Sequence, residues 1–224
     1  MGFWANQKAK RAYKNALNDY QLNYADWKRD IEIFTKIKDV FDLAVKGEDA
    51  VENLTVQKAG EVVLWRGKGQ FHEAGRTAGH YVGSSQGVSI PIVAGIRYRV
   101  GAMRGTFIPG DEIQVYKEVG DVVLTTDRLM FNGMMNTKEW VFSKWNGAAT
   151  SSDETDYIFH VSNRQKTSGI LFSGNVGREF NRFLAQALNS AEQGLGAVKP
   201  IVSKVLKDLA EDEPKKPLLE LPSA

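Results

Sequence analysis

The longest stretch without glycine or proline, residues 5–46, constrains the fold of this chain more than any other feature. Apolar side chains recur in it at alternating steps of about four and three residues, which places them on one stripe of an α-helix. They are Tyr13, Leu17, Tyr20, Tyr24, Trp27, Ile31, Phe34, Ile37 and Phe41. A helix of about forty residues is roughly 60 Å long, which exceeds the width of a small domain. We therefore expect either a helical hairpin with a break near residues 18–23, or one helix that projects and pairs with a partner.

This amphipathic helix either docks on its own domain or forms a coiled-coil dimerisation arm. Docking is favoured because the stripe is mostly aromatic, whereas coiled-coil seams are built mainly from Leu and Ile. The helical pattern ends at Gly47. The sequence thus predicts an N-terminal helical region over residues 1–55.

Short β-branched and aromatic runs follow, from Val62 to Phe172. Turn residues separate these runs at intervals typical of an antiparallel meander. An amphipathic helix is predicted next over residues 177–189, with Phe180, Phe183 and Leu184 on its buried face. Residues 196–224 are predicted to form a short helix and a disordered Pro-rich tail.

The segment "GDVVLTTDRLMFNG" resembles the central hairpin of GRAM and bacterial pleckstrin-homology-like (PH-like) domains. Gly120, Thr125, Arg128, Leu129 and Phe131 occupy the positions that carry the resemblance. The chain is also similar to actinobacterial and phage-type proteins of that kind. The later segments "KEWVFSKWNGAAT", "YIFHVSNRQKTSGILFSG" and "EFNRFLAQAL" resemble the next strand, the final hairpin and the closing helix.

This resemblance covers about residues 60–190 and implies an α+β fold. Its core is a curled antiparallel sheet or barrel of about seven strands, and a C-terminal helix plugs the open end. The implied PH-like domain spans residues 56–195. It contains a Gly-rich segment, residues 73–112, that is longer than the usual first connection. This segment either forms a long twisted hairpin or serves as an elaborated binding loop.

Basic residues are concentrated around that segment. Residues 56–110 carry seven Lys and Arg against two acids, whereas residues 111–195 carry eight against eleven. The candidate anion-binding residues are Arg66, Lys68, Arg76, Arg97, Arg99 and Arg104. Arginine suits bidentate phosphate contact, and the PH-like resemblance makes Lys68 and Arg76 the first candidates. The alternative is a solvated basic face that pairs with the acidic residues of 111–156 or with another subunit.

Catalytic patterns are absent from the sequence. It has no cysteine and three histidines, His72, His80 and His160, none of which stands in a metal-binding motif. It contains neither a phosphate-binding loop nor a nucleophile elbow. Arg128 is interpreted as a structural residue that bonds backbone carbonyls at its corner. We therefore expect no catalytic residues, no metal and no cofactor.

These observations favour a non-enzymatic PH-like binding or adaptor protein, which mediates protein–protein contacts or contacts with an anionic membrane or phosphate. One alternative is a structural or assembly subunit that oligomerises through its N-terminal helix, and another is an enzyme on an elaborated β scaffold. No nucleic-acid module is recognisable, so nucleic acid is not an expected partner. Without a membrane-spanning run or a secretory signal, a cytoplasmic location is expected, including the inner face of the membrane.

Overall fold

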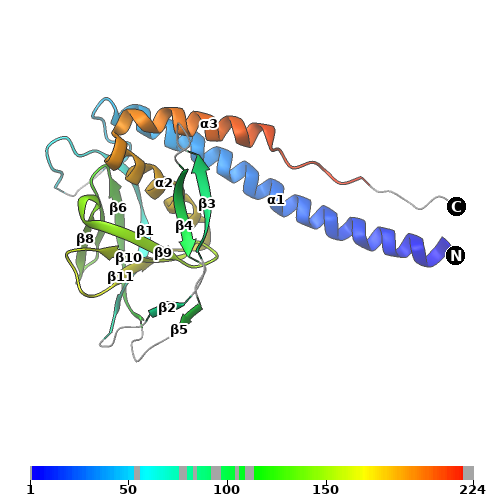
Figure 1. The fold of residues 1–224 in the computed structure, drawn as a ribbon, viewed down its shortest axis with the longest axis horizontal. Coiled ribbons are helices and arrows are strands. Elements are labelled where there is room, and N and C mark those ends of the chain that lie inside the picture. Colours follow the sequence, from blue (N-terminus) through cyan, green and yellow to red (C-terminus); the bar gives the residue numbers. More distant parts are fainter. Residues whose placement is uncertain are drawn as a thin grey trace. The chain divides into compact units, whose positions relative to one another are not determined.

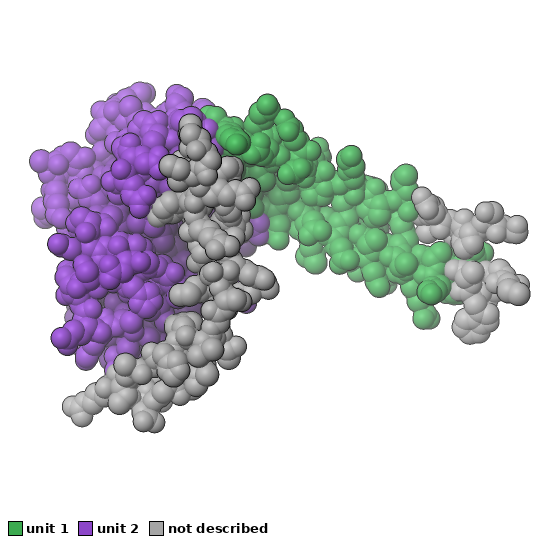
Figure 2. Space-filling model, viewed as in Figure 1, with its two compact units in different colours: residues 1–36, 202–224 green, residues 37–201 purple. Residues whose placement is uncertain are grey.

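The structure of this chain is a computed structural model, and two compact units make it up: residues 1–36 with 202–224, and residues 37–201 (Figure 2). It describes residues 2–52, 56–75, 80–82, 85–91, 97–103, 106–108 and 114–218, with side chains for 6–52, 56–75 and 114–218.

The larger unit contains a seven-stranded antiparallel sheet with the strand order β8-β7-β6-β1-β11-β10-β9 (Figure 1). Its strands are β1 (Val63–Ala74), β6 (Gln114–Thr125), β7 (Arg128–Asn132), β8 (Thr137–Val141), β9 (Trp145–Thr150), β10 (Asp156–Val161) and β11 (Ser168–Leu171). A single turn of 3₁₀-helix, η2 (Phe142–Lys144), joins β8 to β9. The sheet is open, with β8 and β9 at its edges. The predicted α+β class and antiparallel sheet are confirmed.

Strand β1 is the centre of this sheet and pairs with β6 on one side and β11 on the other. Its register against β6 shifts between Val63 and Trp65 and again between Gln70 and His72. Such bulges bend a strand and increase its twist. The bends help β1 to pair with β6 along its length and with β11 over Gln70–Glu73.

Helix α2 (Gly174–Gln193) covers one face of the sheet. The predicted buried face is confirmed, since Phe180, Phe183 and Leu184 are all buried. The Phe180 ring lies 5.4 Å from the ring of Trp65 and 4.5 Å from that of Phe172. The helix ends at Gly194, whose φ of 86° is accessible to glycine at little cost.

The segment between β1 and β6 forms paired strands outside the seven-stranded sheet. β2 (His80–Val82) pairs with β5 (Thr106–Ile108), and β3 (Ser85–Pro91) pairs with β4 (Arg97–Met103). Both pairs are antiparallel and nested. Of the two alternatives for residues 73–112, the described strands match the long hairpin.

Helix α1 (Gly2–Ala44) runs without a break, so of the two alternatives the continuous helix is confirmed and the hairpin with a break near residues 18–23 is not formed. That stretch is polar but contains neither glycine nor proline, and its residues cost an α-helix only tenths of a kcal/mol each. The C-terminal end of α1 belongs to the larger unit, where Ile37, Val40 and Phe41 are buried.

Helix α3 (Val198–Glu211) follows α2 after the short 3₁₀-helix η3 (Leu195–Ala197). At its start, Lys199 Nζ donates to Asp42 Oδ1 at 2.9 Å within the larger unit. In the smaller unit, Trp27 Nε1 of α1 donates to the carbonyl of Leu209 at 2.7 Å. None of the described helices is both long and apolar enough to cross a bilayer.

Candidate functional site

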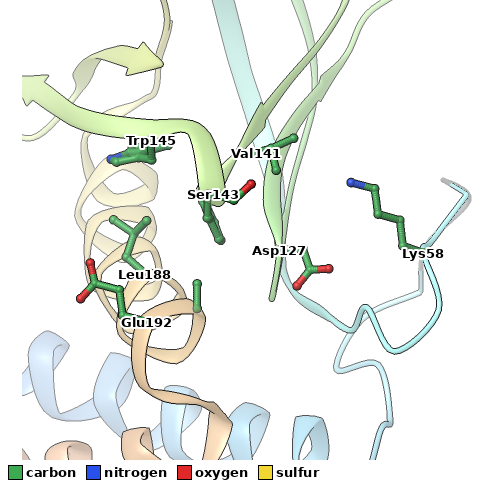
Figure 3. Close-up of a pocket in the computed structure, with 9 residues that line it drawn as sticks. Lys58, Asp127, Val141, Ser143, Trp145, Leu188 and Glu192 are labelled. Carbon is green, nitrogen blue, oxygen red and sulfur yellow. The ribbon is translucent and has the colours of Figure 1, made fainter. Parts of the chain in front are cut away.

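A pocket of about 490 Å³ lies between α2 and the β8–η2–β9 corner, within the larger unit. Its volume is typical of sites that bind small molecules or single side chains. Residues from four parts of the unit line it: Lys58, Asp127, Val141, Phe142, Ser143, Trp145, Leu188, Ala191 and Glu192. Figure 3 shows Leu188 and Glu192 on the helix, across the pocket from Asp127 and Lys58.

Aromatic packing and a backbone bond hold the η2 wall of the pocket. The Trp145 ring lies 5.8 Å from that of Phe142 and 5.3 Å from that of Phe159, which is buried in the core. The Phe142 amide donates to the carbonyl of Asp127 at 2.9 Å. This wall is therefore fixed to both the core and the β6–β7 corner, and the pocket is largely preformed.

The charged groups of the pocket are two carboxylates, Asp127 and Glu192, and one ammonium, Lys58. Lys58 Nζ already lies 3.9 Å from Glu139 Oε1. The pocket lining thus combines the apolar side chains of Trp145 and Leu188 with two carboxylates and one ammonium. This arrangement suits an apolar group that carries a positive charge nearby.

A buried ion pair lies next in the chain to Asp127 and three positions from Lys58, which both line the pocket. Arg128 Nε donates to Glu61 Oε1 at 2.7 Å and Arg128 Nη2 to Glu61 Oε2 at 2.9 Å. The same guanidinium donates to Glu139 Oε2 at 2.7 Å and to the Val56 carbonyl at 2.8 Å. Arg128 does bond a backbone carbonyl, as interpreted, but it is that of Val56, 72 positions away, and not one of the β6–β7 corner. The two carboxylates were missed, because they lie 67 and 11 positions from Arg128 in the chain and no local pattern joins them to it.

This geometry determines the charge states of Glu61 and Arg128. Burial acts to raise the pKa of Glu61, but hydrogen bonds from Arg128, the Lys58 amide and Thr125 outweigh it and lower the pKa. The Glu61 hydrogen bonds raise the pKa of Arg128, against its own desolvation. Both groups are therefore charged across the physiological range, and the segment that carries Lys58 is anchored to the corner.

The predicted basic residues are brought together only in part. Arg66 and Lys68 lie on β1, and both bond Asp121 Oδ1 on β6, at 3.1 and 3.0 Å. Burial acts to raise the pKa of Asp121, but these two cations lower it below its usual value. The charge on this face is therefore partly compensated by an acid of the 111–156 region.

The structure does not describe the side chains of the other four candidates. Arg97 and Arg99 lie in β4, opposite Pro91 and Ser89 of β3. Arg76 and Arg104 lie outside the described residues. Convergence of these arginines on one surface stays a prediction.

His72 belongs to a buried polar cluster. Its Nδ1 lies 2.9 Å from Gln114 Oε1, and Tyr116 donates to Asp156 Oδ2 at 3.0 Å. His72 Nε2 lies 2.8 Å from Asp156 Oδ1, although neither atom makes a hydrogen bond of good geometry. The imidazole is fully buried, so a substrate cannot reach it. This cluster fixes the β1–β6–β10 junction.

The acidic side chains in the turn between β9 and β10 bond other residues of the same chain. Asp153 accepts from Ser151 and Thr155, and Glu154 pairs with Arg182 at 2.9 Å. Within the part of the chain that the structure describes, no three His, Asp or Glu side chains are grouped to hold a metal ion.

Comparison of the chain with family models, with curated proteins and with solved structures finds no match. Sequence reasoning missed the pocket because its lining residues come from segments up to about 130 positions apart, from Lys58 to Glu192.

Proposed function

We propose that this chain is a PH-like binding protein whose pocket between α2 and the β8–η2–β9 corner holds a segment of a protein partner. The pocket is the observation that carries this proposal. Its lining combines the apolar side chains of Trp145 and Leu188 with two carboxylates, Asp127 and Glu192, against the one ammonium of Lys58. The occupant that fits best is an apolar side chain with a Lys or Arg beside it.

The PH-like assignment is supported by the chain order of the elements. The resembling hairpin "GDVVLTTDRLMFNG" corresponds to β6 and β7, with Thr125 and Arg128 at the corner. Strands β1 and β6–β8 form one half of the sheet, β9–β11 form the other, and α2 follows the last strand. An adaptor role accords with a fully buried His72 and with an Arg128 committed to Glu61 and Glu139.

A protein segment is favoured over an anionic membrane or phosphate by the charges that the structure describes. The pocket lining carries two carboxylates and one ammonium, and both Arg66 and Lys68 already bond Asp121. An anion would have to compete with that carboxylate.

A displayed library of random peptides tests the proposal. The parent chain should enrich sequences with an apolar residue next to Lys or Arg. Ala191→Trp, which adds bulk at an exposed position of the lining, should abolish their binding, and Glu192→Lys should weaken it. Arg66→Ser with Lys68→Ser is the matched control and should leave binding unchanged.

If no peptide is enriched, or if the enriched peptides still bind Ala191→Trp, the proposal that the pocket holds a protein segment is refuted. If the parent chain instead sediments with vesicles that contain phosphatidylserine, and Arg97→Ser with Arg99→Ser abolishes this, the anionic-surface function replaces the protein-segment function.

A further inference from the structure

The turn between β7 and β8, residues 133–136, holds two adjacent methionines in water. Met134 is 99 % exposed and Met135 is 89 % exposed. Methionine is an apolar residue that is more often buried than exposed. At these two positions the side chains make almost no contact with the rest of the chain, so packing does not explain their presence.

A carboxylate fixes the backbone of this turn. Strand β6 continues past the end of its register with β7, which places Glu118 beside the turn. Glu118 Oε2 accepts from the Met134 amide at 2.9 Å, and its Oε1 accepts from the Asn136 amide at 2.6 Å. The Asn136 side chain also donates to Oε1 at 2.6 Å. These hydrogen bonds outweigh desolvation and lower the pKa of Glu118, so this carboxylate is charged at neutral pH.

Glycine at position 133 permits this close approach. A Cβ on Gly133 would lie 2.5 Å from the carboxyl carbon of Glu118 and would force the carboxylate to move. The Gly133 amide donates to the Asn136 carbonyl at 2.8 Å, which closes the turn. These contacts involve the backbone and polar side chains. The conformation of the turn therefore does not depend on the two methionine side chains, whose sulfur atoms are open to solvent.

Met130 provides a comparison within the same hairpin. It lies on β7, is 5 % exposed and packs in a buried cluster with Val63 and Val123. The chain has no cysteine, so all of its sulfur belongs to its five methionines. An oxidant that attacks sulfur therefore reacts with thioethers in this chain, and access decides which of them reacts first.

The reaction needs no catalytic group from the protein. The thioether sulfur attacks one oxygen of a hydroperoxide, so an S–O bond forms and the O–O bond breaks. The other oxygen leaves with the proton as water or an alcohol. Sulfur loses two electrons, the peroxide gains them, and the product is methionine sulfoxide. In the return reaction two thiols become a disulfide, and the sulfoxide oxygen leaves as water.

We propose that Met134 and Met135 form a site of reversible oxidation, whose oxidants are hydroperoxides and whose sulfoxides are reduced by thiol-dependent methionine sulfoxide reductases. Oxidation turns a flexible apolar side chain into a polar one, which disrupts a core. In this turn the same change alters the surface alone, because Glu118 holds the backbone. The turn thus switches between an apolar and a polar surface while the fold is kept. This inference does not depend on the α2 pocket or its occupant.

Hydrogen peroxide added to the full-length chain tests the proposal, with peptide mass spectrometry over time as the readout. Trypsin cuts after Arg128 and Lys138, so one peptide contains all three methionines of the hairpin, and its fragmentation locates each added oxygen. Met134 and Met135 should each gain one oxygen at least about tenfold faster than Met130, whose sulfur is reached when the fold opens. In urea the three rates should be similar. Equal rates in the folded chain, or no oxidation of the turn, would overturn the proposal.

Reduction of the treated chain tests reversibility. Dithiothreitol and the two reductases, one for each sulfoxide epimer, should restore both thioethers while the chain stays folded. Oxygen that remains on either methionine would overturn the reversible site.

Met134→Leu with Met135→Leu is the matched control. It should gain no oxygen in the turn, oxidise Met130 at the parent's rate and keep the parent's thermal midpoint. Peroxide should leave the midpoint of the parent unchanged as well. A fall of the midpoint in the treated parent that is absent from the treated variant would show that the fold depends on these two side chains, and the proposal would fail.

Discussion

At the residue scale, Glu61 and Arg128 form a buried ion pair in the larger unit. Both side chains are buried, and the guanidinium contacts the carboxylate through two nitrogens. Glu61→Gln should destabilise the chain by about 3–5 kcal/mol, because it leaves a buried guanidinium without its main counter-charge. Urea unfolding measures this loss.

The control for Glu61→Gln is Glu139→Gln, which removes the second carboxylate of the same arginine. The Glu139 side chain is 39 % exposed, so its loss should cost no more than about 1 kcal/mol. Equal losses for the two variants would contradict the assignment of Glu61 as the main partner.

His160 gives the fold a dependence on pH. Burial lowers the pKa of His160 below its ordinary 6.5. The unfolded chain therefore takes up a proton at this residue before the folded chain does, and stability is lost as pH falls from about 6.5 through the lower folded-state pKa. His160→Gln should show a smaller fall in the urea midpoint between pH 7.5 and pH 5.5. An identical fall of the urea midpoint in the parent and the variant would show that His160 is not the source of this pH dependence.

The buried positions and the contacts of single residues could be predicted only in part from the sequence. The apolar face of α2 followed from its helical period, because each side chain of a helix has a fixed direction. The carboxylate partners of Arg128 did not follow. Glu61 lies 67 positions away, and only the folded register of β1 against β6 brings the two together.

At the element scale, two glycines of α2 have opposite roles. A Cβ on Gly177 would collide with the Glu154 carbonyl in the β9–β10 turn, whereas a Cβ on Gly174 would meet nothing within 4 Å. Tyr157 also donates to the Gly177 carbonyl at 3.1 Å. The close approach of α2 to this turn therefore requires glycine at position 177 but not at 174.

Alanine substitutions should separate the two roles. Alanine is a better helix former than glycine by about 0.8–1.0 kcal/mol, so Gly174→Ala should raise the thermal midpoint or leave it unchanged. Gly177→Ala should lower it, because α2 would have to move away from the turn. A higher thermal midpoint for Gly177→Ala would show that the β9–β10 turn can move away from the added methyl group without a loss of stability.

Element types were predictable where the pattern was long and regular, as in α1 and α2. The sequence left a continuous α1 and a helical hairpin as alternatives, and the hairpin did not form because polar residues such as Asn18 and Asn23 do not by themselves end a helix. The start of α2 was expected at 177 and lies at Gly174, since Ser173 adopts the extended N-cap backbone conformation. Helix ends depend on such local geometry more than on composition.

At the scale of the whole molecule, the pocket and the division into units lay beyond sequence reasoning. The division of the chain places the last turns of α1 with the sheet and the first 36 residues with the end of the chain. A composition break at Gly47 gives no sign of this, because the helix is continuous across residue 37. The boundary depends on which apolar residues of α1 are buried, and only the folded chain shows that.

Two truncated chains test this organisation. A chain that starts at Asp30 keeps the buried apolar residues of α1, which are Ile33, Phe34, Ile37, Val40, Phe41 and Ala44. A chain that starts at Val56 loses all of them. Burial of a large apolar side chain contributes about 1.5–3 kcal/mol, and a domain has only about 5–15 kcal/mol in total. The longer chain should unfold cooperatively, and the shorter one should show no cooperative transition.

The same two chains separate folding from self-association. The chain from Asp30 lacks residues 1–29 of α1, the part of the N-terminal helix through which an assembly subunit is expected to self-associate, so it should be folded and monomeric. Circular dichroism during heating reports the first property and sedimentation equilibrium the second. If the chain from Val56 unfolds at the midpoint of the parent, the buried end of α1 is dispensable. If the chain from Asp30 still dimerises, the contact between copies lies outside the N-terminal half of α1.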